Sequence, residues 1–381
     1  MSVLLACLLV LLGLGAAERR ARDAAWRAVP VRIHVNGTRG KSTVTRLIWA
    51  ALLEAGVPTV AKTTGTAPRL LLPDGSERSL ARRGPASFRE PLALLRRARR
   101  EGARAVVAEC MALDPGLQWV SEREMIGASV GVITNARTDH TEVMGPSLQD
   151  VANSLANTIP PGGVLVAGDR RFADLLEQRA ALAGARVVFA ADPDPAASPG
   201  ERWMREDERI ALAATRQLGI GDDVAARGFA RAPRDPGAAT GGVARVARRP
   251  LRWIDATAAN DPESLQALVE DLLAGPEGGV SLRPDLVVYN HRADRVPRLA
   301  CFAGQSAVIS GSARLVVTGD RPPWTVWRRL RRRQGTAPLF VPARRLSRWL
   351  QTGADDASVL VFCGNTRGLD VARTMAEVSR G

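Results

Sequence analysis

The stretch VNGTRGKST, residues 35–43, decides the fold of this 381-residue chain. It lies between an apolar segment predicted as a strand, residues 32–37, and a segment with helical periodicity, residues 42–56. A glycine-rich loop between a strand and a helix points backbone N–H groups and a helix N-terminus at phosphate oxygens. Lys41 adds a positive charge, and the Ser42 hydroxyl can bind Mg²⁺. The stretch therefore predicts a phosphate-binding loop.

The loop departs from the general P-loop pattern at its first position, where Val35 stands in place of glycine. This departure removes the match to ordinary P-loop GTPases and leaves the spacing G-T-x-G-K-[ST]-T. A glycine-rich turn without a ligand is the alternative, and the flanking strand and helix disfavour it. We expect the following residues to bind nucleotide: Asn36, Gly37, Thr38, Arg39, Gly40, Lys41, Ser42 and Thr43.

Strand-like and helix-like segments alternate from Val29 onward. Apolar strands separated by amphipathic helices indicate a parallel sheet covered on both faces, which is a doubly wound α/β domain. Pro and Gly gather over residues 231–242, RAPRDPGAATGG, where we place a hinge. A second alternating series follows. We predict a P-loop ATPase domain over residues 29–240 and a smaller Rossmann-like α/β domain over residues 246–381.

Residues 3–17 are uncharged, and Glu18, Arg19 and Arg20 follow at once. Fifteen helical residues rise about 22 Å, less than the roughly 30 Å hydrocarbon core, so local thinning of the bilayer must help such a helix to span it. The cations follow the apolar run, which favours a cytoplasmic location for the rest of the chain. We predict a cell-membrane protein with a single N-terminal anchor, residues 1–22, and cytoplasmic catalytic domains. A cleaved leader is the alternative.

Charge and composition exclude some classes of protein. The chain has 53 Lys plus Arg against 39 Asp plus Glu, a formal charge of +14, and only two lysines, Lys41 and Lys62. Aromatic residues make up 4%, too few for a stacking platform, and we expect no nucleic-acid partner. The four cysteines form no CxxC pair, so neither a zinc cage nor a disulfide framework is indicated. The basic run WRRLRRRQ, residues 327–334, is interpreted as a solvated helix face rather than a track for an anionic product.

Polar clusters follow several predicted strands of the first domain: Lys62 to Thr66, Glu109, Asn135, and Asp139 with His140. In doubly wound folds the ligand crevice lies at the carboxyl ends of the strands. Taken singly, each cluster has an ordinary explanation, such as a surface ion pair for Glu109 or a turn for Thr66. Together, beside a phosphate loop, they favour a two-metal nucleotide site.

These motifs, with the linker RAPRDPG and the segment AANDPES (residues 258–264), resemble the Mur ligase superfamily of ATP-dependent amide ligases. A closer resemblance, to the poly-γ-glutamate synthase family, extends to VAKTTGTA, AECMALDP, DHTEVMGPSL, NHRADRV and CGNTRG. The resemblance implies a Mur-ligase-like fold. It also implies polymerisation of glutamate through activation of the γ-carboxyl group as an acyl phosphate, with ATP and Mg²⁺ as cofactors.

By the same resemblance, particular residues take particular roles. The implied catalytic residues are Lys41, Glu109, His140, Arg292 and Asp294. The implied metal ligands are Ser42, Thr66, Glu109 and His140, and further nucleotide contacts are implied for Asn260 and Asp261. The implied partners are glutamate, the growing polyglutamate chain, membrane lipid and other membrane subunits of a synthase complex.

Two departures from the family pattern limit this transfer. Many Mur ligases bridge their metals with a carbamylated lysine, but no lysine follows Lys62 here. Asp207 stands where the family often has an asparagine near adenine. Two other functions stay open: a P-loop NTPase that drives a conformational or transport step of a membrane assembly, and a non-catalytic scaffold.

Overall fold

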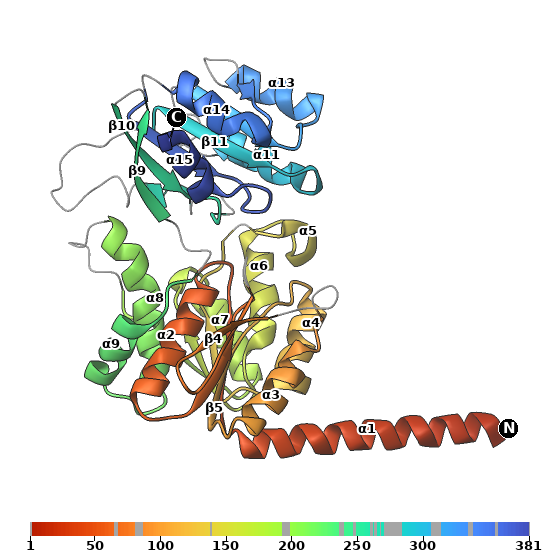
Figure 1. Cartoon of the computed structure of the whole chain (residues 1–381). Helices are drawn as coiled ribbons and strands as arrows, with labels where there is room; N and C mark the ends of the chain where they lie inside the picture. The colour runs from red at the N-terminus through yellow and green to blue at the C-terminus, as the bar shows by residue number, and fades with distance from the viewer. Residues whose placement is uncertain are drawn as a thin grey trace. The chain divides into compact units, whose positions relative to one another are not determined.

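The computed structural model describes residues 2–380 except for 65–67, 81–86, 138, 193–198, 236–239, 247–248, 260–261, 263–264, 267, 270–283, 306–313, 334–337 and 355–356. Thr66, Asn260 and Asp261, three of the predicted site residues, lie outside the described residues. The chain divides into an N-terminal unit, residues 1–192 and 205–236, and a C-terminal unit, residues 193–204 and 237–381 (Figure 1).

The N-terminal unit is built on an eight-stranded sheet with the order β4-β3-β2-β5-β1-β6-β7-β8. Its strands are β1 (Val31–Asn36), β2 (Thr59–Lys62), β3 (Arg69–Leu71), β4 (Glu77–Ser79), β5 (Ala105–Glu109), β6 (Val130–Ile133), β7 (Val164–Ala167) and β8 (Arg186–Phe189). Six strands are parallel, but β3 is antiparallel to both β2 and β4. The prediction of a purely parallel sheet is wrong at this edge, because the connections around β3 are too short for a crossover helix.

Helices cover the N-terminal sheet on both faces. They are α2 (Lys41–Glu54), α3 (Glu90–Arg100), α4 (Pro115–Val120), α5 (Thr141–Met144), α6 (Leu148–Leu155), α7 (Ala173–Leu182), α8 (Pro199–Arg216) and α9 (Asp222–Arg231), with a π-helical segment at Ser121–Ile126 and 3₁₀ turns at Ala156–Thr158 and Arg170–Phe172. Strand β1 lies between β5 and β6, and its Ile33 and Val35 are buried in a core cluster with Val44 and Ile48 of α2. The loop that joins β1 to α2 is therefore fixed at the centre of the sheet.

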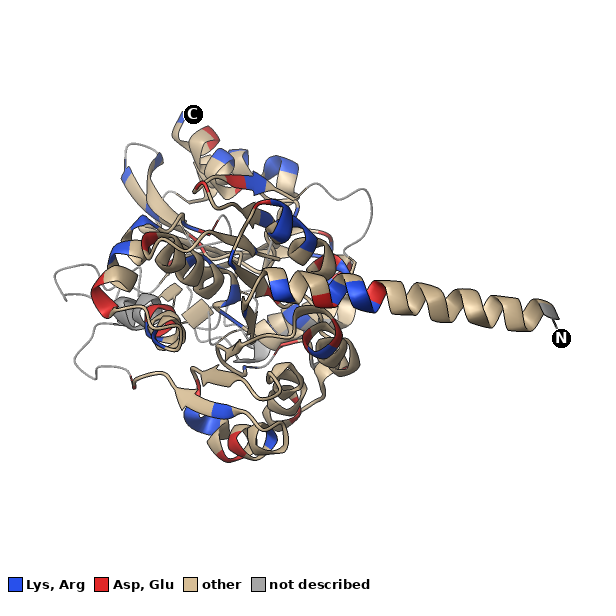
Figure 2. Cartoon of the chain, turned by 90° about the horizontal axis from the view of Figure 1, so that it is seen from below, with Lys and Arg blue, Asp and Glu red and all other residues tan. Residues whose placement is uncertain are grey.

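Helix α1 (Ser2–Ala28) extends outward from the N-terminal unit, and charged residues appear only toward its C-terminal end (Figure 2). Its large apolar side chains between residues 3 and 14 are exposed. The last turns pack on the unit, where Trp26 Nε1 donates to Met125 O at 2.9 Å and Arg22 pairs with Glu124 at 2.6 Å. Among the described residues we find no helix with the length and apolar character needed to cross a membrane. The spanning anchor stays a prediction.

The C-terminal unit contains a six-stranded sheet with the order β13-β12-β11-β14-β10-β9. Its elements are β9 (Thr240–Val246), β10 (Arg249–Asp255), β11 (Leu286–His291), a 3₁₀ turn (Ala293–Arg295), α11 (Val296–Gln305), β12 (Arg314–Gly319), α13 (Trp324–Arg333), β13 (Leu339–Phe340), α14 (Ala343–Gly353), β14 (Val359–Cys363) and α15 (Val371–Arg380). Five strands are parallel, and β9 forms an antiparallel hairpin with β10. This second sheet is therefore also mixed.

Two apolar clusters cover opposite faces of the C-terminal sheet. One contains Val326 and Leu330 of α13 with residues of α11, and the other contains Leu346 and Leu350 of α14 with residues of α15. The alternation of side chains along each buried parallel strand supplies both clusters. The sequence also predicts a helix over residues 262–273, and most of these residues lie outside the described part of the chain.

Candidate functional site

The phosphate loop has two positions that only glycine fits. Gly37 has φ 131° and Gly40 has φ 78°, both in the region that side chains rarely adopt. A Cβ atom at Gly37 would lie 2.0 Å from Thr134 Oγ1, and one at Gly40 would lie 2.2 Å from Asp207 Oδ1. The loop is thus packed against the end of β6 and against α8, which fixes its path before α2 begins.

Asn135, directly after β6, holds the loop in this conformation. Its side-chain Oδ1 accepts hydrogen bonds from Thr38 Oγ1 at 2.8 Å and from the Arg39 backbone N–H at 3.0 Å, and its carbonyl accepts from the Thr38 N–H at 3.0 Å. Thr38 Oγ1 also accepts from the Arg137 N–H at 2.9 Å. The sequence pointed to Asn135 as a strand-end residue, and the structure assigns it to shaping the loop.

Asn36, predicted to bind nucleotide, supports the loop from inside the protein. Its Nδ2 donates to Gln118 Oε1 at 2.9 Å and to Thr158 Oγ1 at 3.2 Å, while its Oδ1 accepts from the Gly37 N–H at 2.8 Å. The side chain is buried. Both the nitrogen and the oxygen of the Asn36 side-chain amide therefore form hydrogen bonds with protein groups.

Lys41 places its ammonium group over the loop. Nζ donates to the carbonyls of Gly37 at 2.6 Å and Thr38 at 3.3 Å. Burial lowers the pKa of Lys41, and the nearby Glu109 carboxylate partly opposes this effect. A compact cation held against a glycine-rich loop is suited to neutralise a phosphoryl group.

Glu109, at the end of β5, connects two other segments of the site. Its Oε2 accepts from Ser42 Oγ at 2.8 Å and from the Thr64 N–H at 2.7 Å, and its Oε1 accepts from Thr64 Oγ1 at 2.6 Å. Two predicted metal ligands, Ser42 and Glu109, are therefore in contact, and Thr64 joins them. The predicted ligand in this segment was Thr66; Thr64 belonged to the same polar cluster but was not assigned a role.

The donor set around Glu109 fits a hard divalent cation. Carboxylate and hydroxyl oxygens are the ligands that Mg²⁺ takes from proteins, and it obtains the others from water and substrate phosphates. No group of three or more His, Cys, Asp or Glu side chains suited to a metal occurs in the described part of the chain. Ser42 and Glu109 are the residues here that would hold Mg²⁺.

His140 has a backbone conformation that is unusual for a residue with a side chain. Its φ is 46°, and no other described non-glycine residue has a positive φ. Its recorded contacts are Glu142 Oε1, 3.3 Å from Nδ1, and Asp139 Oδ1, 3.8 Å from Nε2. Asp139 also pairs with Arg39 at 3.2 Å, which ties this segment to the phosphate loop. Among the described residues, His140 contacts neither Ser42 nor Glu109.

Asp207 of α8 packs against the same loop from the other side. The side chain is buried, its Oδ1 lacks a hydrogen-bond partner among the described residues, and its carboxyl group hydrogen-bonds the Thr43 side chain. Burial raises the pKa of Asp207 well above its usual range, and the neighbouring Glu206 adds to the effect. A neutral carboxyl group is compatible with phosphate nearby, whereas a carboxylate would repel it.

A buried ion pair supports the strand that leads into the loop, and sequence reasoning missed it. His34 Nδ1 of β1 lies 2.8 Å from Glu122 Oε2, and both side chains are buried. Burial lowers the pKa of His34, but Cys110 and Glu122 outweigh burial and raise it to about 10. The two residues are 88 positions apart in the sequence, so no local pattern reveals the pair.

In the C-terminal unit, two predicted catalytic residues contact each other. Arg292 Nε donates to Asp294 Oδ1 at 2.9 Å, and Arg292 Nη2 donates to Asp294 Oδ2 at 2.6 Å. The Arg292 guanidinium lowers the pKa of the Asp294 carboxyl group. Both follow β11 at the carboxyl end of the sheet, the edge at which ligands bind in open α/β sheets.

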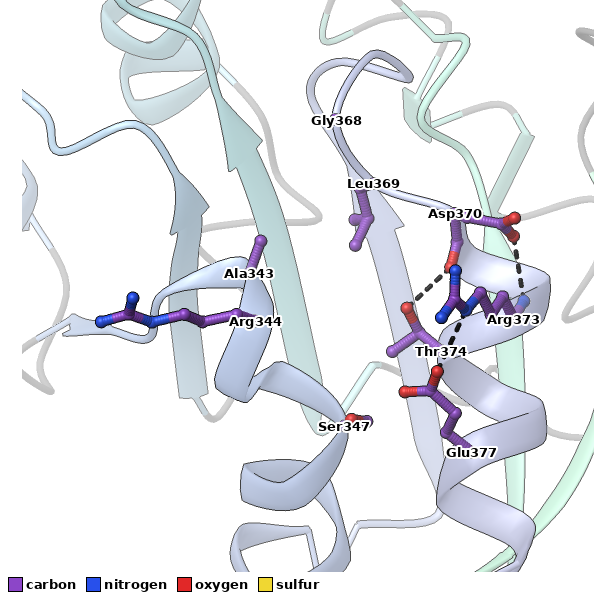
Figure 3. Close-up of a pocket in the computed structure, with 9 residues that line it drawn as sticks. All are labelled: Ala343, Arg344, Ser347, Gly368, Leu369, Asp370, Arg373, Thr374 and Glu377. Atoms are coloured by element: carbon purple, nitrogen blue, oxygen red, sulfur yellow. Dashed lines mark hydrogen bonds and ion pairs between the residues drawn. The ribbon is translucent and has the colours of Figure 1, made fainter.

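A separate groove of about 590 Å³ lies between α14 and α15 (Figure 3). Asp370 accepts from the Arg373 N–H at 2.9 Å, and Glu377 pairs with Arg373 at 3.1 Å. The groove holds none of the predicted site residues. Its lining is Ala343, Arg344, Ser347, Gly368, Leu369, Asp370, Arg373, Thr374 and Glu377.

Comparison with known protein families covers both units. Residues 35–213 match the Mur ligase middle domain, and residues 242–377 match the poly-gamma-glutamate synthase CapB C-terminal domain. The first match contains the phosphate loop, Glu109 and His140. The second contains Arg292 and Asp294.

Individual proteins are also similar over most of the chain. The PGA synthase CapB of Bacillus subtilis (strain 168) is 33% identical over 328 residues, which are 84% of this chain and 81% of that protein. The capsule biosynthesis protein CapB of Bacillus anthracis is 34% identical over 309 residues, 78% of this chain and 65% of that protein. A bifunctional folylpolyglutamate synthase/dihydrofolate synthase solved with Mn, AMPPNP and L-glutamate shares 17% identity at a TM-score of 0.59, covering 94% of this chain and 92% of that chain.

Proposed function

Because this chain belongs to the CapB family of poly-γ-glutamate synthases, we propose that it polymerises glutamate by activating the γ-carboxyl group as an acyl phosphate. It is an ATP-dependent ligase that forms amide bonds with glutamate. The observation that carries the proposal is the contact of Ser42 with Glu109 beside the Lys41 ammonium, because this arrangement suits phosphoryl transfer.

A carboxylate resists attack by an amine because it is an anion without a good leaving group. In the proposed reaction a γ-carboxylate oxygen attacks the terminal phosphorus of ATP, and ADP leaves. The amine of a second glutamate then attacks the acyl carbon, loses a proton to solvent and displaces phosphate. The product is an amide bond, and one ATP is consumed for each bond.

The chain's own residues bind and orient the nucleotide in this scheme. The backbone N–H groups from Gly37 to Gly40 and the N-terminus of α2 bind its phosphates. Lys41 turns from the carbonyls of its loop to the phosphoryl group and neutralises it. Ser42 and Glu109 would hold Mg²⁺, which would supply positive charge to the transferring group. Arg292 and Asp294 keep their predicted catalytic role.

We also propose that residues 3–17 attach the chain to the cell membrane, with both units on the cytoplasmic side. The support is the exposed apolar surface of α1, of which Val3, Leu4, Leu9 and Leu11 are examples. Burying such side chains in lipid is favourable by about 2 kcal/mol for each large aliphatic group. Other membrane subunits of a synthase complex are proposed partners.

An isotope experiment tests the acyl-phosphate route. Glutamate labelled with ¹⁸O in its γ-carboxylate is incubated with the enzyme, ATP and Mg²⁺, and the released phosphate is examined by mass spectrometry. The bridging oxygen leaves with the phosphoryl group, so we expect one ¹⁸O atom in each phosphate. Unlabelled phosphate accompanying polymer would exclude the route. Phosphate release that needs no glutamate would instead favour an NTPase that drives a conformational change.

A further inference from the structure

Residues 321–354 contain nine arginines and no aspartate or glutamate. This segment, which begins just after β12 and contains α13, β13 and all of α14, contributes nine of the fourteen net positive charges of the chain. Six of these arginines are described and exposed. We call them the arginine edge: Arg321, Arg328, Arg331, Arg344, Arg345 and Arg348.

The topology places the arginine edge around one rim of the C-terminal sheet. Strand β13 is the terminal strand of that sheet. Helix α13, just before it, packs on one face through Val326 and Leu330, and helix α14, just after it, packs on the other face through Leu346 and Leu350 (Figure 1). The apolar sides of both helices are therefore used for packing, which leaves their arginines directed away from the core.

No carboxylate neutralises the arginine edge within the described part of the chain. None of its six members forms an ion pair there; Arg321 lies over the Phe340 ring of β13, 5.7 Å from its centroid. Some exposed arginines elsewhere do pair with carboxylates: Arg216 pairs with Asp222, and Arg227 and Arg231 both pair with Glu54. Arg344 and Arg348 are one helical turn apart, a spacing at which like charges repel each other. No ion pair with a described carboxylate offsets this repulsion.

We propose that the arginine edge binds the acidic polymer that this enzyme makes, as a track for the growing chain. The proposal rests on the proposed function for the identity of the polymer. A γ-linked polyglutamate carries one free carboxylate per residue, and guanidinium groups bind carboxylates with two parallel hydrogen bonds. A single exposed ion pair is weak, but several pairs on one polymer act together because the effective concentration of each further carboxylate is high.

The track would keep the product on the enzyme between additions. It revises the interpretation of the run at residues 327–334 as a solvated face, because the unneutralised cations continue through α14 beyond the end of that run. Binding through exposed charges weakens as salt screens them, with a Debye length of about 8 Å at physiological ionic strength.

The test compares two triple variants of the full-length protein that change the net charge equally. R344E/R345E/R348E alters the arginine edge, and R96E/R99E/R100E alters three exposed arginines of α3. Binding of a fluorescent poly-γ-glutamate oligomer is followed by anisotropy at two salt concentrations, without ATP. We expect the first variant to lose affinity by about tenfold or more and the second by no more than about twofold. Both should still add one glutamate to a short acceptor, but only the first should make shorter polymer.

Equal losses in the two variants would show attraction by net charge alone and would overturn the proposal. So would binding of single-stranded DNA or of anionic phospholipid vesicles through these arginines when the oligomer does not bind. The milder R344Q/R345Q/R348Q variant, checked by circular dichroism, separates lost binding from lost folding. The binding assay does not depend on catalysis. If the protein binds the oligomer through the arginine edge but never synthesises polyglutamate, the proposed function is wrong and the proposed binding site is not.

Discussion

Lys41 is the residue on which we expect the nucleotide chemistry to depend most directly. It is one of only two lysines in a chain with 53 cationic residues. Its Nζ lies over the loop carbonyls, and the Glu109 carboxylate is near. A guanidinium is planar and broader than an ammonium group, and it does not replace a point charge between phosphates.

We expect Lys41→Ala to reduce ATP-dependent ligation by about 100-fold or more, because a positioned charge is lost from the transferring phosphoryl group. Lys41→Arg should fail to restore it. Arg96→Ala, at an exposed site on α3, is the control and should retain activity. Phosphate release with glutamate present measures the effect, and thermal unfolding confirms that each variant is folded. Near-normal turnover in Lys41→Ala would contradict the phosphate-loop assignment.

The raised pKa of the buried Asp207 carboxyl group should make the stability of the protein depend on pH. Its pKa is raised in the folded protein, mainly by burial and then by Glu206, so the folded state holds a proton that the unfolded state releases above about pH 4. Stability therefore falls as pH rises from about 4 through the raised pKa. Thr43 and Arg137 act in the opposite direction, and Glu208 acts in the same direction as Glu206.

We expect Asp207→Asn, which has nearly the same shape, to unfold at a higher temperature than the natural protein at pH 7 to 8. The difference should shrink as the pH falls toward 4, because the aspartic acid then becomes protonated in the unfolded state as well. Thermal unfolding followed between pH 4 and 8 measures it. A difference that is constant over this range would show that Asp207 does not change its protonation on unfolding.

At the scale of elements, α1 combines two different surfaces. Its apolar residues up to Leu14 are exposed, whereas its C-terminal turns belong to the N-terminal unit. Arg32 of β1 donates to the carbonyls of Trp26 at 3.0 Å and Val29 at 2.9 Å, so the end of the helix also caps the start of the sheet. The C-terminal end of the helix is therefore held against the N-terminal unit.

Two deletions should separate these surfaces. Removing residues 2–17 should give a protein that needs no detergent and binds ATP with unchanged affinity, because the contacts of Arg22 and Trp26 are kept. Removing residues 2–28 should lower the free energy of unfolding by on the order of 2–3 kcal/mol, since a packed Trp is lost. Urea unfolding and nucleotide titration measure both. Equal stability of the two forms would contradict the packing of α1.

At the scale of the whole molecule, the chain passes between the two units for the last time at Pro236 and Gly237, inside the stretch predicted as a hinge. Each unit has its own sheet and its own apolar clusters. Because few chain crossings join two such units, we expect the linker to be the first site of proteolytic attack.

Limited trypsin digestion should cut first after the exposed Arg234 and leave two resistant fragments. Mass spectrometry identifies the cut. The digest should lose ligation, because the predicted catalytic residues Lys41 and Arg292 would then lie on separate chains. Initial cleavage within either sheet would contradict the predicted boundary of 240 to 246.

The sequence by itself determined the glycine-rich loop between a strand and a helix, the α/β alternation and the position of Glu109 at a strand end. These follow from local rules: glycine spacing, apolar periodicity and the position of polar residues after a strand. The distance from Ser42 to Glu109 agrees with them, because adjacent parallel strands bring their carboxyl ends to one edge.

Only the tertiary structure decided the antiparallel strands β3, β4 and β9, the choice of Thr64 as a partner of Glu109, and the placement of Asp207 against Gly40. The same holds for the His34–Glu122 pair. Each depends on register or on contacts between residues far apart in the chain, and local patterns carry no information about either. The arginine edge shows both levels at once: composition reveals its charge, and the position of β13 at the rim of the sheet leaves that charge exposed.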